Sequence, residues 1–149
     1  MITKLSVVSI LVRDQDEALQ WFTEKLGFEK RTDDSAAVPG YRWLTIGPKG
    51  QKDLEIVLHK PRSPEALEQV GKQAGVPGQP EDSWVFQTDD CKNTYEELRA
   101  KGVKFLGEPV ERPYGVEVGF EDLYGNIYWL IQPKQTEVPP EKKPVMAEA

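Results

Sequence analysis

The sequence predicts an α+β fold made of two βαβββ modules, and two observations carry this prediction. First, a short strand rich in β-branched residues, an aspartate, an amphipathic helix and a glycine follow one another near the N-terminus, and this order recurs about 75 residues later. Second, a Pro- and Gly-rich stretch separates the two copies. Each copy would pack one sheet face against its helix, so that the helices lie outside and the other sheet faces turn inward around a cleft.

The first module is expected over residues 4–60. Residues 5–12 predict a buried strand, because they are rich in Val and Ile and too few for a helix. Asp14 and Glu17 then have the spacing of a helix capping box. The helix that follows shows apolar residues at three-to-four-residue spacing and a terminal glycine, namely Ala18, Leu19, Phe22, Leu26 and Gly27. Further strands are expected at residues 28–32, 41–46 and 54–58.

Residues 61–81 are expected to link the modules, with one weakly helical piece at residues 64–74. The second module is expected over residues 82–133, with strands at residues 84–88, 104–106, 116–120 and 127–132. Asp89 or Asp90 would cap its helix, Tyr95 and Leu98 mark the apolar face of that helix, and Gly102 would end it. Residues 1–135 therefore predict a single domain, and residues 136–149 a disordered tail.

The composition excludes several classes of partner. The 149-residue chain has 19 Lys and Arg against 25 Asp and Glu, a net charge of -6, and no basic stripe for nucleic acid. No apolar run approaches the roughly 18 to 20 residues of a membrane helix, and the first residues do not read as a secretion signal. Cys91 is the only cysteine, so an intramolecular disulfide is excluded and a cytoplasmic location is expected.

Three stretches carry a resemblance to a known family. They are residues 11–14 through 21–22 to 26–28, residues 88–90 to 102–103, and residues 120–126, which read Phe-Glu-Asp-Leu-Tyr-Gly-Asn. In this order and spacing they resemble the vicinal oxygen chelate superfamily, which includes glyoxalases, bleomycin-resistance proteins and extradiol dioxygenases. The resemblance implies that the two modules form a curved, U-shaped mixed sheet around a small-molecule cleft, often in a homodimer.

Metalloenzymes that this chain resembles place one ligand on the first strand and one on the last strand of each module. Carried over by spacing, these positions fall on Val7 and Glu55 in the first module and on Ser83 and Trp129 in the second. Only Glu55 is a competent ligand, with His59 as a helper on the same strand face, whereas a catalytic metal needs about three protein donors. No metal cofactor is therefore expected.

Strand alternation predicts which side chains face the cleft. The inward set is Val7, Ser9, Leu11, Tyr41, Trp43, Glu55, Val57, Ser83, Val85, Gln87, Ile127, Trp129 and Ile131. Trp43 and Trp129 would stack on an organic ligand, while Ser9, Glu55 and Gln87 would orient it. The alternative is that the two tryptophans fill a collapsed core and that Glu55 is a solvated rim residue.

Three residues outside the strand centres are weighed separately. Tyr114 lies in a turn that closes over the cleft in proteins with this resemblance, so it is a candidate ligand contact. His59 has no sequence partner that would orient it, and it is expected at a strand end on the surface. Cys91 stands in the first turn of a helix, but no second residue indicates nucleophilic catalysis.

The leading hypothesis is a cytoplasmic protein that binds a cationic or amphipathic organic molecule without a metal, resembling the bleomycin-resistance branch. One alternative is an enzyme, namely a metal-dependent lyase, isomerase or ring-cleaving dioxygenase. The missing ligands count against this alternative. The other alternative is a dimeric interaction module whose cleft is filled by side chains.

Overall fold

The computed structural model describes residues 1–72 and 83–135. The first module consists of β1 (Val7–Leu11), α1 (Gln15–Leu26), β2 (Glu29–Asp34), β3 (Trp43–Gly47) and β4 (Glu55–His59). The second consists of β5 (Val85–Gln87), α3 (Cys91–Ala100), β6 (Lys104–Phe105), β7 (Val110–Arg112), β8 (Gly115–Glu121) and β9 (Ile127–Pro133). The expected pair of modules is confirmed, with β7 as a strand that the sequence pattern did not predict.

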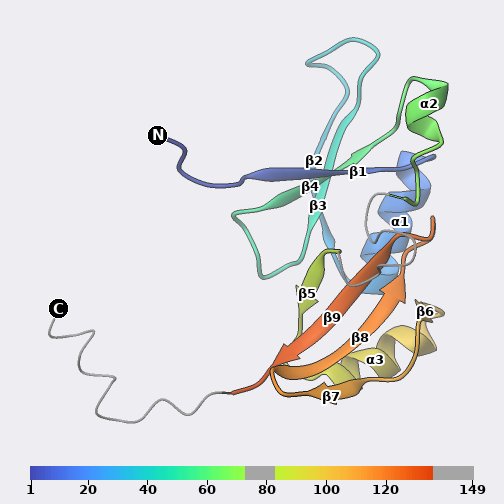
Figure 1. Ribbon diagram of the computed structural model, residues 1–149. Helices are drawn as coiled ribbons and strands as arrows, with labels where there is room; N and C mark the ends of the chain where they lie inside the picture. The colour runs from blue at the N-terminus through green and yellow to red at the C-terminus, as the bar shows by residue number, and fades with distance from the viewer. Residues whose placement is uncertain (73–82, 136–149) are drawn as a thin grey trace, which may run out of the picture.

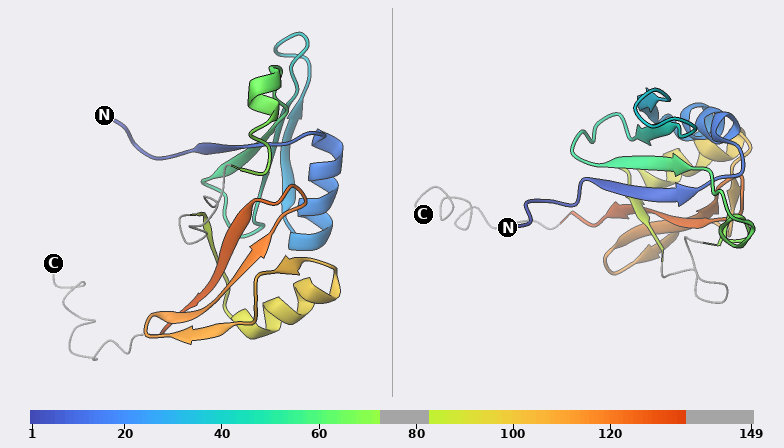
Figure 2. Two further views of the ribbon diagram at one scale, coloured as in Figure 1. Left: turned by 45° about the vertical axis from the view of Figure 1, so that its right-hand side comes forward. Right: turned by 90° about the horizontal axis from the view of Figure 1, so that it is seen from above.

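The two modules share one sheet topology. Their strand orders are β1-β4-β3-β2 and β5-β9-β8-β6, with β7 paired to β8 beside this path (Figure 1). In each sheet the first strand pairs in parallel with the last, and the remaining pairs are antiparallel. The equivalence of the two strand orders supports an internal duplication. Both long helices lie on the same side of the sheets (Figure 2), which leaves the opposite sheet faces turned away from them.

Both helices begin and end at the residue types that the sequence indicated. The Asp14 side chain accepts a hydrogen bond of 2.9 Å from the Glu17 backbone N–H, and Gly27 ends α1 in the left-handed region with φ 71°. In the second module the cap is Asp90, which accepts from the backbone N–H of Asn93 at 3.0 Å. Gly102, with φ 93°, follows the end of α3.

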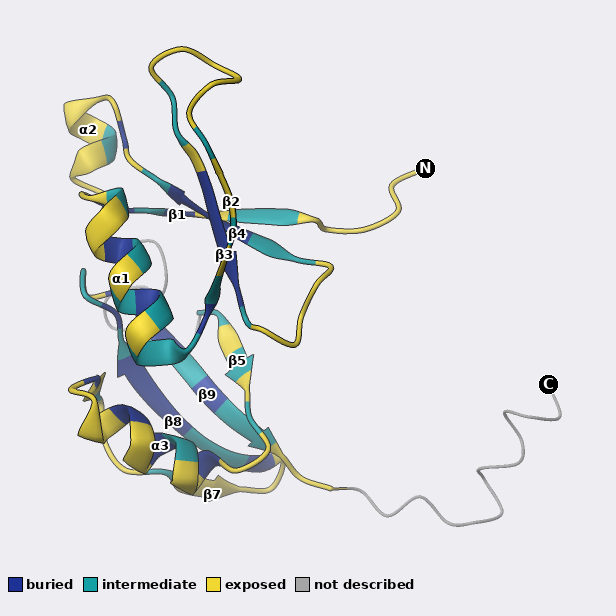
Figure 3. Cartoon of the chain, turned by 180° about the vertical axis from the view of Figure 1, so that it is seen from behind, coloured by how far each residue is buried: buried dark blue, intermediate teal, exposed yellow. Residues whose placement is uncertain are grey.

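One apolar core joins the two modules, and it lies between the helices and the sheet faces that pack against them (Figure 3). Its fully buried members come from both halves and include Ile10, Phe22, Leu44, Leu58, Cys91, Phe120 and Tyr128. The rings of Phe28 and Phe86 meet edge to face across the junction, with centroids 5.5 Å apart. The modules are therefore halves of one packed domain.

The turn between β8 and β9 is held by a buried carboxylate. Asp122 accepts hydrogen bonds from the backbone N–H groups of Tyr124 and Asn126, from the Asn126 side-chain amide, and from the Tyr128 hydroxyl at 2.6 Å. Burial raises the pKa of Asp122 despite these four donors, and burial also raises the pKa of Tyr128. The Asp-x-x-Gly-Asn motif of the sequence is thus a structural turn.

The expected helical piece in the linker is shorter than its sequence pattern indicated. α2 spans only Pro64–Leu67, and Ser63 caps it. Gly71 then adopts φ 83° where a Cβ atom would stand 2.0 Å from the Tyr124 carbonyl oxygen, so the chain closes against the second module here. The remainder of the expected linker and the expected disordered tail lie outside the described residues. Within residues 1–72 and 83–135 no helix is long and apolar enough to cross a membrane.

Candidate functional site

The candidate site is the sheet surface that faces away from α1 and α3, here called the open face. Alternation along β1 buries Ile10 in the core and leaves Ser9 exposed, and along β5 it packs Phe86 against the core and leaves Val85 56% exposed. The face assignment predicted from the sequence is therefore confirmed for these strands. Its members include Val7, Ser9, Leu11, Trp43, Glu55, Val57, Val85, Gln87, Trp129 and Ile131.

In the first module the open face is polar at one end and aromatic at the other. Glu55 is half-buried, and its carboxylate accepts a 2.6 Å hydrogen bond from the hydroxyl of Thr45, which is fully buried. Between the two ends, Val57 is also buried. Trp43 is 38% exposed at the other end, beside the Tyr41 ring at 6.4 Å. The centre of this face is thus buried, whereas Trp43 remains accessible.

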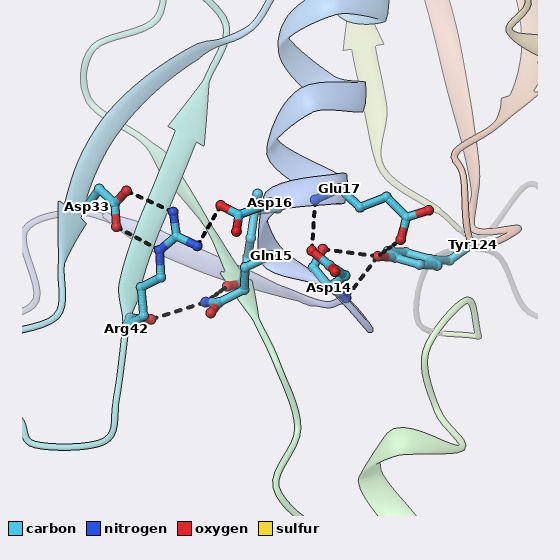
Figure 4. Close-up of polar contacts among 8 residues, drawn as sticks. Asp14, Gln15, Asp16, Glu17, Asp33, Arg42 and Tyr124 are labelled. Carbon is cyan, nitrogen blue, oxygen red and sulfur yellow. Dashed lines mark hydrogen bonds and ion pairs between the residues drawn. The ribbon is translucent and has the colours of Figure 1, made fainter.

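The strand end that carries Trp43 is anchored to α1. The guanidinium of Arg42 forms ion pairs of 2.8 Å with Asp33 on β2 and with Asp16 on α1 (Figure 4). The Gln15 side-chain amide donates to the carbonyl oxygens of Arg42 and Leu58. The hydrogen bond from Arg42 lowers the pKa of Asp33. These contacts fix the position of the neighbouring tryptophan.

In the second module Trp129 lies over a glycine. The β8–β9 register pairs it with Gly119, where a Cβ atom would stand 3.3 Å from the Trp129 ring and 2.7 Å from the Leu106 side chain. Trp129 is half-buried and pairs on its other side with Val85 of β5. A larger side chain at position 119 would therefore displace the ring or Leu106.

A carboxylate that the sequence analysis missed also lies on this face. Glu117 pairs with Ile131, so alternation along β8 places it on the open face, and this alternation was the available signal. It accepts hydrogen bonds from the Tyr114 hydroxyl at 2.6 Å and from Arg112 Nε at 3.2 Å. The hydrogen bond to Glu117 raises the pKa of Tyr114. Tyr114, a predicted ligand contact, is 54% exposed and holds Glu117 in the β7–β8 hairpin.

The predicted site residues share a face rather than an enclosed cavity. A hollow of about 750 Å³ near the end of β9 includes Gln87 but neither Trp43 nor Trp129 in its lining. Ser9 and Val57 are direct neighbours across β1 and β4, and Gln87 neighbours Ile131 across β5 and β9. The two modules thus present separate halves of the site.

The donors near Glu55 do not fit a catalytic divalent metal. Val7 lies opposite Glu55 in the parallel register, and the Glu55 carboxylate accepts a hydrogen bond from the Thr45 hydroxyl. Among residues 1–72 and 83–135 no three His, Cys, Asp or Glu side chains gather into a possible metal site. The equivalence drawn between Glu55 and Trp129 also needs correction. Trp129 pairs with Val85, so the second-module position beside Ser83 is that of Ile127, whose carbonyl oxygen accepts from the Ser83 hydroxyl.

Two further residues are placed by the structure. His59 ends β4 half-buried, and its Nδ1 lies 3.3 Å from the Tyr41 hydroxyl, a partner that sequence spacing did not indicate. Cys91 is fully buried in the core, and burial raises the pKa of its thiol, so this residue is a core side chain.

A contact between the modules lies beside the start of α1. The Asp14 backbone N–H donates to the Tyr124 hydroxyl oxygen at 3.1 Å, and this hydroxyl lies 3.2 Å from the Asp14 carbonyl oxygen (Figure 4). The Tyr124 ring also lies 5.5 Å from the Arg13 guanidinium carbon. The turn held by Asp122 therefore connects the second module to the first.

Comparison with known proteins establishes the family. Residues 4–130 match the model of the Glyoxalase/Bleomycin resistance protein/Dioxygenase superfamily, and the chain belongs to this superfamily. The uncharacterized protein YetH of Bacillus subtilis (strain 168) is 35% identical over 130 residues, which cover 87% of this chain and 98% of YetH.

Solved structures of the same fold match over most of the chain. The crystal structure of UcmS2 is 40% identical, with a TM-score of 0.75, over 89% of this chain and 99% of that one. TnmS3, an antibiotic binding protein from Streptomyces sp. CB03234, is 29% identical with a TM-score of 0.72, over 89% and 98% of the two chains. The fold predicted from the sequence is thereby confirmed.

Proposed function

We propose that this protein binds a cationic or amphipathic aromatic molecule on the open face, without a metal and without chemical conversion. The observation that carries the proposal is the accessible Trp43 and half-buried Trp129 on that face, with carboxylate, hydroxyl and amide groups nearby. The Glu55 carboxylate is bound by the uncharged Thr45 hydroxyl, so it suits a ligand cation. The similarity to TnmS3, an antibiotic binding protein, supports the same class of function.

The binding unit that we propose is a cytoplasmic homodimer. A drug-sized ligand usually buries about 70 to 90% of its surface in its site, and an open face of one chain would cover such a ligand from one side. Val85 and Trp43 are 56% and 38% exposed in a single chain. The open face of a second copy would enclose the ligand and bury these side chains.

A first experiment separates binder from metalloenzyme. Chelator-treated protein is titrated calorimetrically with Ni²⁺, Zn²⁺, Mn²⁺ and Fe²⁺, and we expect no stoichiometric binding, because Glu55 lacks the two further donors that a catalytic site needs. Tight binding that is lost in Glu55→Ala would revive the lyase, isomerase or dioxygenase alternative.

A second experiment tests the site itself, with the planar aromatic cation proflavine as the probe. Trp43→Ala and Trp129→Ala are each expected to weaken its binding about tenfold, from the loss of one stacking partner. Trp21→Phe is the control, since Trp21 packs on α1 against the core. Unchanged binding in both alanine variants would refute the open-face site, and the absence of proflavine binding would favour the filled-cleft interaction module.

A further inference from the structure

Two hollows flank the short strand β5 at the junction of the modules. The larger, of about 680 Å³, lies between the end of α1, the loop after β3, β5 and α3. The smaller, of about 330 Å³, lies between β5 and the β1–β4 side of the first sheet. Both are bordered by Pro48, Gln51, Val85 and Phe86, so they adjoin along one strand. Their volumes fall in or near the range of about 300 to 1,000 Å³ of small-molecule sites.

The walls of these hollows are mainly apolar. Phe86 contributes to both, and its ring centroid lies 5.5 Å from that of Phe28 and 6.3 Å from that of Phe120, which also line the larger hollow. Leu98 and Leu130 complete its floor. In the smaller hollow Trp84 takes the place of Phe28 and Phe120. Side chains of the shared core thus form part of the walls of these hollows.

Charge is nearly absent from the lining. Among the described residues that border either hollow, only Lys49 carries a charge, and it is exposed in the loop after β3. No Asp or Glu of residues 1–72 and 83–135 borders them. Polar orientation would come from Thr88 and Thr94, whose hydroxyl oxygens are 2.8 Å apart at the larger hollow. A charged ligand would lose hydration here with little compensation.

We propose that this junction is a second binding site, which takes an uncharged, apolar small molecule such as an aromatic hydrocarbon. The site is distinct from the aromatic and acidic part of the open face, because Trp43, Glu55 and Trp129 border neither hollow. The open-face residues Val85 and Gln87 lie at the border between the two regions. A molecule bound there would fill the gap between the modules and stabilise their packing.

The test uses full-length protein and the neutral fluorescent probe 1-N-phenylnaphthylamine. We expect saturable binding of one molecule per chain and an increase in melting temperature. Gly50→Phe is expected to weaken binding at least tenfold, because Gly50 borders the larger hollow and has open space at its Cβ position. Gly107→Phe, at an equally open position that borders neither hollow, is expected to change affinity less than twofold.

A second blocking variant, Gln51→Phe, changes an exposed residue that borders both hollows and guards against a local effect of Gly50→Phe. Trp43→Ala and Trp129→Ala should change the affinity for the probe less than twofold relative to the unchanged protein. The test therefore distinguishes failure of this site from failure of the open-face site. Three outcomes would overturn the proposal. The first is loss of probe binding in the tryptophan variants, and the second is unchanged probe binding in both blocking variants. The third is loss of probe binding when the protein self-associates.

Discussion

The two modules keep the same strand order but differ in how they close their last hairpin. In the first module the loop between β3 and β4 runs through exposed residues such as Lys49 and Asp53. In the second, Asp122 is buried in the turn between β8 and β9 and accepts four hydrogen bonds. The two modules therefore share their strand order but stabilise their last hairpins by different contacts.

The same contrast holds on the open face. Val57 pairs with Ser9 in the first module, and Trp129 pairs with Val85 in the second, so Trp129 takes the position of Val57. By the same register Glu117 takes the position of Trp43. Core-facing positions stay apolar in both modules, whereas open-face positions have exchanged aliphatic, aromatic and acidic side chains. Packing constrains the core-facing positions, whereas the open-face positions are free to change.

The largest effect should come from the buried turn. Asp122→Ala leaves several donors without an acceptor inside the protein, so we expect a loss of about 3 kcal/mol or more of unfolding free energy in urea. Asp53→Ala, in the exposed hairpin of the first module, should change stability by less than about 0.5 kcal/mol. Equal effects would show that the two hairpins do not differ as described.

A slightly smaller loss is expected where the linker after α2 meets that turn. Gly71→Ala places a Cβ atom against the Tyr124 carbonyl oxygen at a positive φ, and we expect a cost of about 2 kcal/mol or more. Gly40→Ala is the matched control, because Gly40 has a similar φ of 77° and an open Cβ position. Thermal unfolding of both variants measures the difference, and a neutral Gly71→Ala would mean that this contact is not tight.

Removal of one hydroxyl group tests the contact between Tyr124 and the start of α1. Tyr124→Phe removes the hydroxyl that meets the backbone of Asp14, and we expect about 1 kcal/mol of destabilisation. Tyr114→Phe removes a hydroxyl that donates to Glu117 within the β7–β8 hairpin, and should cost less. Faster amide exchange at the start of α1 in Tyr124→Phe alone would confirm that the turn steadies the first module.

The smallest effect concerns acid stability. Because Arg42 lowers the pKa of Asp33 in the folded state, this carboxylate adds stability above the ordinary aspartate pKa of about 4, and the gain disappears as pH falls through the lower folded value. Asp33→Asn should therefore cost less than about 1 kcal/mol at pH 7, and this cost should shrink as the pH falls below the ordinary aspartate pKa of about 4. A stability difference that does not shrink as the pH falls would exclude the ion pair as its cause.

Local patterns in the sequence determined the modules, the caps at Asp14 and Gly27, and the alternation that sorts Ile10 from Ser9. These features depend on neighbours along the chain, so spacing alone predicts them. The strand β7 was missed because its three exposed residues have no apolar alternation.

Tertiary structure alone decided which distant residues meet. The partner of His59 is Tyr41, Trp129 stands opposite Val85, and Tyr124 reaches the start of α1 across 110 residues of chain. These contacts depend on the register between strands and on how the two sheets pack. A shift of one residue in the register would move every side chain of the strand to the opposite face of its sheet. The sequence determined the faces of the sheets, and only folding decided which side chains meet across them.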